Sequence, residues 1–263
     1  IYVLTQEGAM EGLKHYLVPD FSQITNPKLI VSAMGQAFFS MSLGVGTMLV
    51  YGSYIRADEN LPVVGALVTL TDTSVAFLAG LLVLPAIFVA QNLGVTIYAE
   101  SGNLIAGPDL IFQVLPALFD GMGAAGLLVG LAFFVLMSIA AVTSSISMLE
   151  VPVSYAVEAH QVSRIKATWL VGLAIFAVSA TICFNFESLF GFVITLTTER
   201  AQPLLSMMLC IFAGWIFYRN SILEELKSGS PDVEQGLFWK IWPVYVKFFC
   251  PALILMTFAQ GFS

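Results

Sequence analysis

Long apolar runs alternate with short polar connections along most of this chain. A helix of about 20 apolar residues is long enough to cross the hydrocarbon core of a bilayer. The pattern predicts six membrane spans, at residues 28–53, 62–90, 124–157, 165–184, 188–218 and 238–262. A shorter apolar segment near 108–119 cannot span, so we expect a helix at the membrane surface or one that folds back into the protein. The expected fold class is all-α integral membrane.

The first span differs from the others because small and polar residues interrupt it. They are Gln36, Ser40, Ser42, Gly44 and Gly46. Ser40 lies twelve residues beyond Lys28, about 18 Å along a helix and so near the middle of the membrane. A helix that breaks there exposes backbone carbonyls and amides, which suit a cation and a carboxylate. The alternative is that the small residues only allow close helix packing.

Composition and charge narrow the class of protein. Hydrophobic residues make up 58% of the chain and charged residues 10%, and the mean hydropathy is +0.90. A soluble domain needs more charge than this. The net charge of −7 argues against nucleic-acid binding, which requires basic surface. Cys183, Cys210 and Cys250 show neither metal-ligand nor disulfide spacing. The sequence also shows no nucleophile–base pair of the kind that an enzyme would use.

The distribution of Lys and Arg orients the spans. Basic residues occur in the connections 54–61, 158–164 and 219–237, whereas residues 91–123 and 185–190 contain none. The positive-inside rule therefore places the three basic connections in the cytoplasm.

Residues 1–27 then form an extracellular loop. The chain starts at Ile1, without an initiator Met or a signal peptide. We therefore expect it to be the C-terminal part of a longer membrane protein.

Three segments carry polar residues within the apolar background: residues 35–44 with 51–54, residues 71–80, and residues 140–150. With these segments the chain resembles the neurotransmitter:sodium symporter family, in particular its bacterial amino-acid transporters. The segments are similar to the sixth, seventh and eighth transmembrane helices of that family. The resemblance covers nearly the whole chain and implies that the first five helices are missing.

The resemblance also implies a domain organisation. After the loop 1–27, residues 28–218 form the second inverted repeat of the leucine-transporter-like fold, with five spans of which the first is broken. Residues 219–237 form a cytoplasmic loop, and residues 238–263 form one extra final span.

The resemblance implies a substrate pocket built from two of the segments. Its lining residues are Phe39, Ser40, Ser42, Val45, Ser144 and Met148. The family often has an aromatic residue where this chain has Val45, so we expect a roomier pocket here.

Asp72 lies about 15 Å along the second span, near the membrane midplane. A carboxylate there costs roughly 2.5–3.5 kcal/mol, so we expect it to be paired with a cation or protonated.

By resemblance Asp72 borders a sodium site and the anion site of chloride-dependent relatives, here Gln36, Ser40, Asp72 and Ala76. Those relatives have Asn at this position and Ser one turn later. We therefore expect chloride-independent transport. Two alternatives are a proton carrier and a structural acid bonded to hydroxyls such as that of Ser40.

Ala140, Thr143 and Ser144 share one face of a helix because they are spaced i, i+3, i+4. The resemblance assigns them to a second sodium site, while Ser40 and Asp72 belong to the first. The alternative is that the hydroxyls bond back to the preceding turn, as they commonly do in membrane helices.

Four further positions carry expectations. Glu150 is interpreted as a structural acid near the cytoplasmic interface, with a proton pathway as the alternative, and Pro152 is expected to interrupt its helix. By resemblance, the family usually has an acidic extracellular gate in the helix that corresponds to the fifth span. Counting back from Gly214 and Trp215 places Ile194 at that position, so the gate is either absent or displaced to Glu199, with Glu187 a weaker candidate.

The leading functional prediction is sodium-coupled symport of an amino acid or related small amine by alternating access. The expected setting is multi-pass insertion in the bacterial inner membrane, in contact with lipid and with the missing N-terminal helices of the same protein. A homodimer is left open as the assembly. The alternative is a channel or a non-transporting membrane sensor built on the same helices. Because half of each site is missing, we expect the fragment alone to be inactive.

Overall fold

The computed structural model describes residues 2–98, 104 and 107–260. The described part of the chain is helical apart from its connections and one isolated bridge between Tyr98 and Leu104. The predicted all-α class is therefore confirmed. The chain forms two compact units, the first built from residues 1–21 and 71–144 and the second from residues 22–70 and 145–263.

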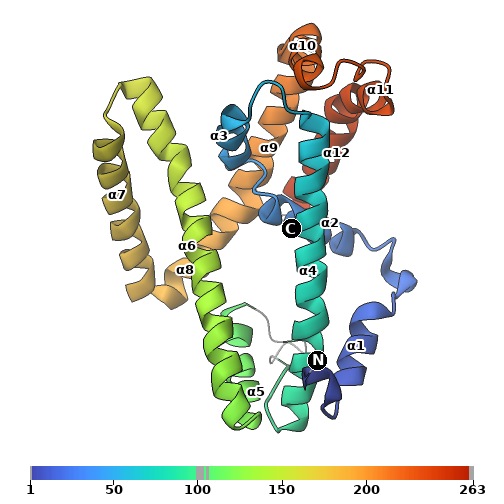
Figure 1. The fold of residues 1–263 in the computed structure, drawn as a ribbon, viewed down its shortest axis with the longest axis vertical. Helices are drawn as coiled ribbons and strands as arrows, with labels where there is room; N and C mark the ends of the chain where they lie inside the picture. The colour runs from blue at the N-terminus through green and yellow to red at the C-terminus, as the bar shows by residue number, and fades with distance from the viewer. Residues whose placement is uncertain (1, 99–103, 105–106, 261–263) are drawn as a thin grey trace. The chain divides into compact units, whose positions relative to one another are not determined.

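Within the described residues, four helical runs are long and apolar enough to cross a membrane. They are α4 (Leu61–Asn92), Ala125–His160 of α6 (Ala124–His160), α7 (Arg164–Phe184) and Leu237–Met256. A fifth run, Phe186–Ile216, bends by 98° into α10 (Arg219–Gly229). These five runs correspond to predicted spans. The remaining predicted span is divided into two short helices, α2 (Pro27–Ser40) and α3 (Thr47–Tyr54), drawn in blue in Figure 1.

The last two spans contain π-helical turns between α-helical segments. The first is composed of α8 (Phe186–Ile194), a π turn at Thr195–Ala201, α9 (Gln202–Ile211) and a π turn at Phe212–Ile216. The second is composed of α11 (Leu237–Val244), a π turn at Tyr245–Phe249 and α12 (Cys250–Gln260). Such turns absorb an extra residue without ending the helix.

Prolines do not interrupt the long helices. Pro85 lies inside α4 and Pro152 inside α6. The prediction that Pro152 interrupts its helix is wrong, because α6 continues to His160. A proline removes a single N–H donor, and a helix of 37 residues keeps the rest of its hydrogen-bond ladder.

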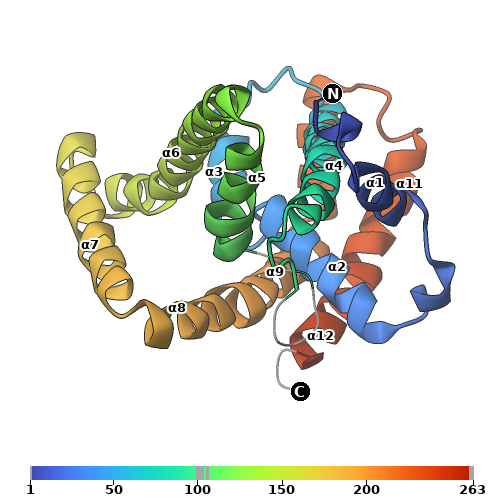
Figure 2. The same ribbon diagram turned by 90° about the horizontal axis from the view of Figure 1, so that it is seen from below.

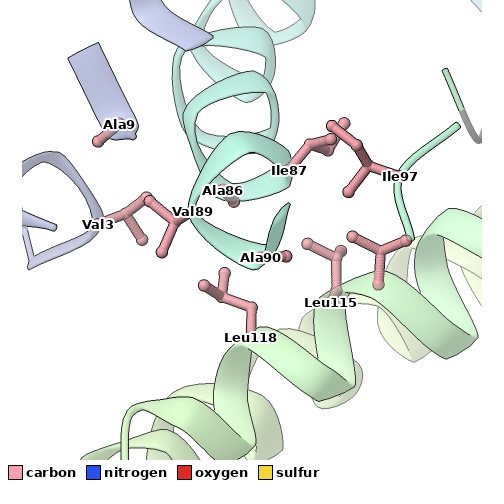
Figure 3. Close-up of a cluster of buried hydrophobic side chains, with 10 residues drawn as sticks. Val3, Ala9, Ala86, Ile87, Val89, Ala90, Ile97, Leu115 and Leu118 are labelled. Atoms are coloured by element: carbon pink, nitrogen blue, oxygen red, sulfur yellow. The ribbon is translucent and has the colours of Figure 1, made fainter. Parts of the chain in front are cut away.

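The first unit has a compact apolar core, shown in Figure 3. Side chains from the short helix Tyr2–Thr5, from α1 (Ala9–Leu17) and from the end of α4 meet those of α5 (Leu115–Gly121). Val89 and Leu118 are examples, both nearly fully buried. The apolar face of the short segment near 108–119 is thus covered by protein.

Two glycines of α6, Gly126 and Gly130, allow α5 to pack closely against it. A Cβ at Gly126 would collide with the carbonyl oxygen of Phe119, and one at Gly130 would lie 3.1 Å from the Phe119 ring. This spacing of two small residues one turn apart allows the two helices to approach closely.

The second unit has a small core of its own within residues predicted as a cytoplasmic loop. Residues 219–237 contain α10, and Leu226, Val233 and Trp239 are buried together. The Ser228 hydroxyl donates to the Ala57 carbonyl at 2.6 Å. The loop is therefore a folded element, because its apolar residues bury one another and bind the connection that follows α3.

Candidate functional site

The break between α2 and α3 is the centre of the candidate site. The N–H of Ser42 donates to the Phe39 carbonyl at 3.1 Å, and the N–H of Leu43 donates to the Phe38 carbonyl at 2.9 Å. This pair of bonds is a Schellman motif, which ends a helix and satisfies two of its terminal carbonyls. The chain therefore leaves the helix at Ser42 by a defined turn rather than by unravelling.

Three residues of the break have positive φ: Ser42 at 50°, Gly44 at 81° and Gly46 at 87°. Glycine adopts such angles without steric cost, whereas an L residue there costs roughly 1–2 kcal/mol. Ser42 therefore keeps a side chain at a position that favours glycine. A strained residue at a helix break supports a functional role for its hydroxyl.

Helix α9 holds the C-terminal end of α2. Gln202 Nε2 donates to the Phe38 carbonyl at 2.8 Å. A Cβ at Gly44 would collide with the Gln202 carbonyl oxygen and with Ser206 Oγ, so only glycine fits at this point. Helices α2, α9 and α12 all pack against one another, as Figure 2 shows.

Helix α3 is held by α6 through side-chain hydroxyls. Tyr51 donates to Ser147 Oγ, and Tyr54 donates to Glu150 Oε1 at 2.5 Å. Arg164 Nη2 lies 2.8 Å from both carboxylate oxygens of Glu150. Glu150 therefore links the end of α3 to the start of α7. We call Tyr54, Glu150 and Arg164 the carboxylate latch.

A cavity of about 520 Å³ lies beside the break within the second unit. Its walls come from α2, α3, α9 and the last span, and they are mostly apolar. Ser42 is the only predicted substrate residue that lines it. The positions of α2 that line it, including Ala37 and Phe38, lie on a different helical face from Gln36, Phe39 and Ser40. Apart from Ser42, the residues that line the cavity are therefore not the predicted substrate residues.

A model of the sodium:neurotransmitter symporter family matches residues 1–263. The chain belongs to the sodium:neurotransmitter symporter family. Together with its bilayer-length helices, this makes it a multi-pass membrane protein of a transporter family and not an enzyme.

Curated relatives of this chain carry sodium in their names. An uncharacterized sodium-dependent transporter of Haemophilus influenzae is 35% identical over 98% of this chain and 55% of its own length. The uncharacterized sodium-dependent transporter YhdH of Bacillus subtilis is 32% identical over 97% of this chain and 56% of its own. The crystal structure of MhsT in complex with L-phenylalanine matches with a TM-score of 0.83 and 34% identity, over 99% of this chain and 58% of that one. The chain thus spans about half the length of these relatives.

The predicted substrate residues of the second unit lie on surfaces that this chain leaves open. Phe39 is 55% exposed, Val45 43% and Met148 51%. Ser40 is exposed as well, whereas Ser42 is partly buried. The break brings Phe39 to Val45 together on one short segment, and Met148 lies on α6.

The predicted ion ligands of the first unit lie on α4 and α6. Asp72 is partly buried, and Ala76 follows one turn later on α4. The Thr143 hydroxyl donates to the carbonyls of Ala140 at 2.9 Å and Ile139 at 3.1 Å. The predicted alternative of bonding to the preceding turn thus occurs in this structure. A hydroxyl that donates its proton still has oxygen lone pairs to offer a cation.

The remaining predicted positions are less informative. The backbone of Glu199 belongs to the π turn Thr195–Ala201, and its side chain lies outside the described part of the structure. Within the described residues, no group of three His, Cys, Asp or Glu side chains could hold a metal ion. The predicted sodium ligands are instead carbonyl and hydroxyl oxygens, together with the carboxylate of Asp72.

The structure adds two groups of residues that sequence reasoning did not assign to the break. One is the α9 pair Gln202 and Ser206, and the other is the carboxylate latch. The signal for Gln202 was present, since an amide in an apolar span needs a hydrogen-bond partner. Its partner could not be found from the sequence, because Phe38 is 164 residues away.

Proposed function

We propose that the full-length protein couples sodium entry to the uptake of an amino acid or related small amine by alternating access. The break at Ser42 to Gly46 carries this proposal, since it interrupts a predicted span with a helix-ending turn that places a hydroxyl at a positive φ. Membership of a sodium symporter family supports it. MhsT was crystallised with L-phenylalanine, which favours an amino acid as the substrate.

The substrate would bind at the exposed side of the break. The proposed lining is Phe39, Ser40, Ser42, Val45, Ser144 and Met148. Exposed apolar side chains such as Phe39 and Met148 suit the side chain of an amino acid, and the break's carbonyls suit its ammonium group. Val45 in place of an aromatic residue would leave space for a larger side chain.

Sodium would bind at two places. The first site would use Ser40 and Asp72, and the second Ala140, Thr143 and Ser144. These groups offer only oxygen ligands, which a hard cation such as Na⁺ prefers. The remaining ligands would come from the N-terminal half of the protein. For this reason we propose that the 263-residue chain is inactive alone, and that Glu199 contributes the extracellular gate only in the whole transporter.

The carboxylate latch would close the cytoplasmic side. It joins α3 to α6 and α7 through a charged pair and a tyrosine hydroxyl. Opening toward the cytoplasm requires α3 to leave α6, so these bonds would break and reform in each transport cycle. A latch made of a few polar bonds suits such a step, because it can be exchanged for water at small net cost.

The proposed chloride independence rests on Asp72 as a fixed negative charge. The test is uptake of radiolabelled L-phenylalanine and other amino acids by proteoliposomes containing the full-length transporter. We expect concentrative uptake driven by an inward Na⁺ gradient, equal in chloride and in gluconate. Uptake without accumulation would indicate a channel and would contradict symport.

Asp72→Asn is the decisive variant. Removing the charge should reduce uptake in gluconate tenfold or more. Chloride should restore this uptake only in part. Asp109→Asn is the matched control, since Asp109 accepts a bond from Gln113 at 2.7 Å outside the long spans. Chloride-insensitive uptake by the Asp72→Asn protein at the normal rate would refute the role of Asp72.

A further inference from the structure

Gln202 is a buried amide within an apolar span. Its side chain and backbone together are only 5% exposed. An amide in such surroundings is costly unless it is hydrogen-bonded. Its Nε2 donates to the Phe38 carbonyl at 2.8 Å, so the bond is made to the end of the broken helix α2.

The Phe38 carbonyl accepts two hydrogen bonds. One comes from Gln202 and the other from the N–H of Leu43 at 2.9 Å. A carbonyl oxygen has two lone pairs, so this oxygen has none left for a cation. The bond from α9 therefore determines which carbonyls at the end of α2 remain candidates to face an ion.

The same helix also contacts the far side of the break. The Gln202 carbonyl oxygen and Ser206 Oγ lie where a Cβ of Gly44 would be. Ser206 is 6% exposed, and its hydroxyl has no hydrogen-bond partner among the described residues. Its contact with Gly44 is therefore steric, whereas the contact of Gln202 with Phe38 is a directed bond.

We propose that Gln202 is a positioning residue for the sodium and substrate site at the break, a role that rests on the proposed symport. Its amide holds the end of α2 in the geometry that the ion requires. Because the bond comes from α9, a shift of α9 along its axis changes the orientation of the carbonyls that follow Phe38. Gln202 itself touches neither ion nor substrate.

The test uses the purified full-length transporter with two readouts. One is the Na⁺ concentration that gives half-maximal uptake, and the other is the Na⁺ concentration that gives half of the thermal stabilisation by Na⁺. The second readout needs no transport. Gln202→Met keeps the size of the side chain and removes the donor. We expect the half-saturating Na⁺ concentration to rise about three- to tenfold in both readouts, the effect of one lost hydrogen bond.

Gln202→Glu provides a signature that a packing role would not produce. An ionised carboxylate cannot donate and would repel the Phe38 carbonyl, whereas a protonated carboxyl can donate to it. We expect this variant to be impaired at pH 8 and to approach the normal protein, measured at the same pH, as the pH falls to 5.5. This rescue also covers the case in which Gln202→Met fails to fold.

Ser206→Ala is the matched control on the same helix face. It removes a hydroxyl that has no partner among the described residues, so sodium affinity should stay within about twofold of normal. Normal Na⁺ affinity in both Gln202 variants, or an equal loss in Ser206→Ala, would overturn the positioning role. If the Na⁺ dependence of thermal stability shifts as expected but the full-length protein shows no uptake, the proposed symport is refuted and the positioning role of Gln202 stands.

Discussion

The two halves of the broken span are held in different ways. Helix α2 has fourteen residues, none of them fully buried, and α9 holds it through a backbone carbonyl at its end. Helix α3 has eight residues and is held through its own side chains, since Tyr51 and Tyr54 donate to Ser147 and Glu150 of α6. The halves are thus attached to different spans. We therefore propose that each moves with its own neighbour, with the break between them as the hinge.

The chemistry of the two attachments also differs. The bond from Gln202 is neutral, and its acceptor belongs to the main chain. The carboxylate latch contains an ion pair between Glu150 and Arg164 at 2.8 Å, with Arg164 63% exposed. A neutral buried bond maintains a fixed geometry, whereas a partly solvated ion pair is readily exchanged for water. This contrast supports the proposals that Gln202 positions α2 and that the carboxylate latch gates α3.

The largest effect should come from a side chain at the hinge itself. Gly44→Ala places a Cβ against the Gln202 carbonyl oxygen and Ser206 Oγ at a φ of 81°. We expect a loss of about 2 kcal/mol or more in stability, together with loss of uptake, measured by thermal unfolding and by transport. Gly35→Ala is the control, because nothing lies within 4 Å of its Cβ and alanine favours the helix by up to about 1 kcal/mol. Equal stability of the two variants would show that α9 does not hold the hinge.

A smaller effect should come from removing the charge of the latch. Glu150→Gln keeps an acceptor for Tyr54 and loses the ion pair with Arg164. We expect a loss of about 1 kcal/mol in stability, discounted for the exposure of the arginine, and faster labelling from the cytoplasmic side of a cysteine introduced at Ser53, an exposed position of α3 that leaves Tyr54 in place. Asp58→Asn is the control, since the Arg56–Asp58 pair is exposed on both sides and should matter little. Unchanged labelling in Glu150→Gln would mean that α3 is not gated by this carboxylate.

The smallest effect should come from substitutions of Ser42, which distinguish the cost of its backbone strain from the contribution of its hydroxyl. Ser42→Gly removes both the hydroxyl and the cost of a φ of 50°, whereas Ser42→Ala removes only the hydroxyl. We expect the glycine variant to be more stable than the alanine variant by about 1 kcal/mol, and both to bind substrate more weakly. Thermal unfolding and substrate saturation measure the two effects. Normal substrate affinity in both variants would remove Ser42 from the pocket.

The spans could be predicted closely from the sequence. Residues 62–90 and 165–184 are predicted, and α4 and α7 run from Leu61 to Asn92 and from Arg164 to Phe184. A bilayer-length helix needs only continuous apolar character, a local property that the sequence displays directly. The break was also predictable, because serine and glycine in mid-span are local signals.

Other features were not predictable from local signals. Pro152 suggested an interruption, but α6 continues through it, since the effect of a proline depends on what its surroundings supply. Residues 219–237 looked polar enough to be a loop, yet they contain α10, and Leu226 and Val233 are buried against Trp239 of α11. Their contacts depend on where distant parts of the chain lie.

The sequence by itself determined the class of protein, the positions of its spans and the place where the first span breaks. Apolar length and helix-breaking residues act over a few neighbouring positions, so they can be recognised from the sequence alone. Only the tertiary structure decided what holds each half of the broken span, namely Gln202 for α2 and Glu150 for α3. Hydrogen bonds are short and directional. The partners of these bonds are separated by about a hundred residues or more along the chain, so no local sequence pattern predicts them.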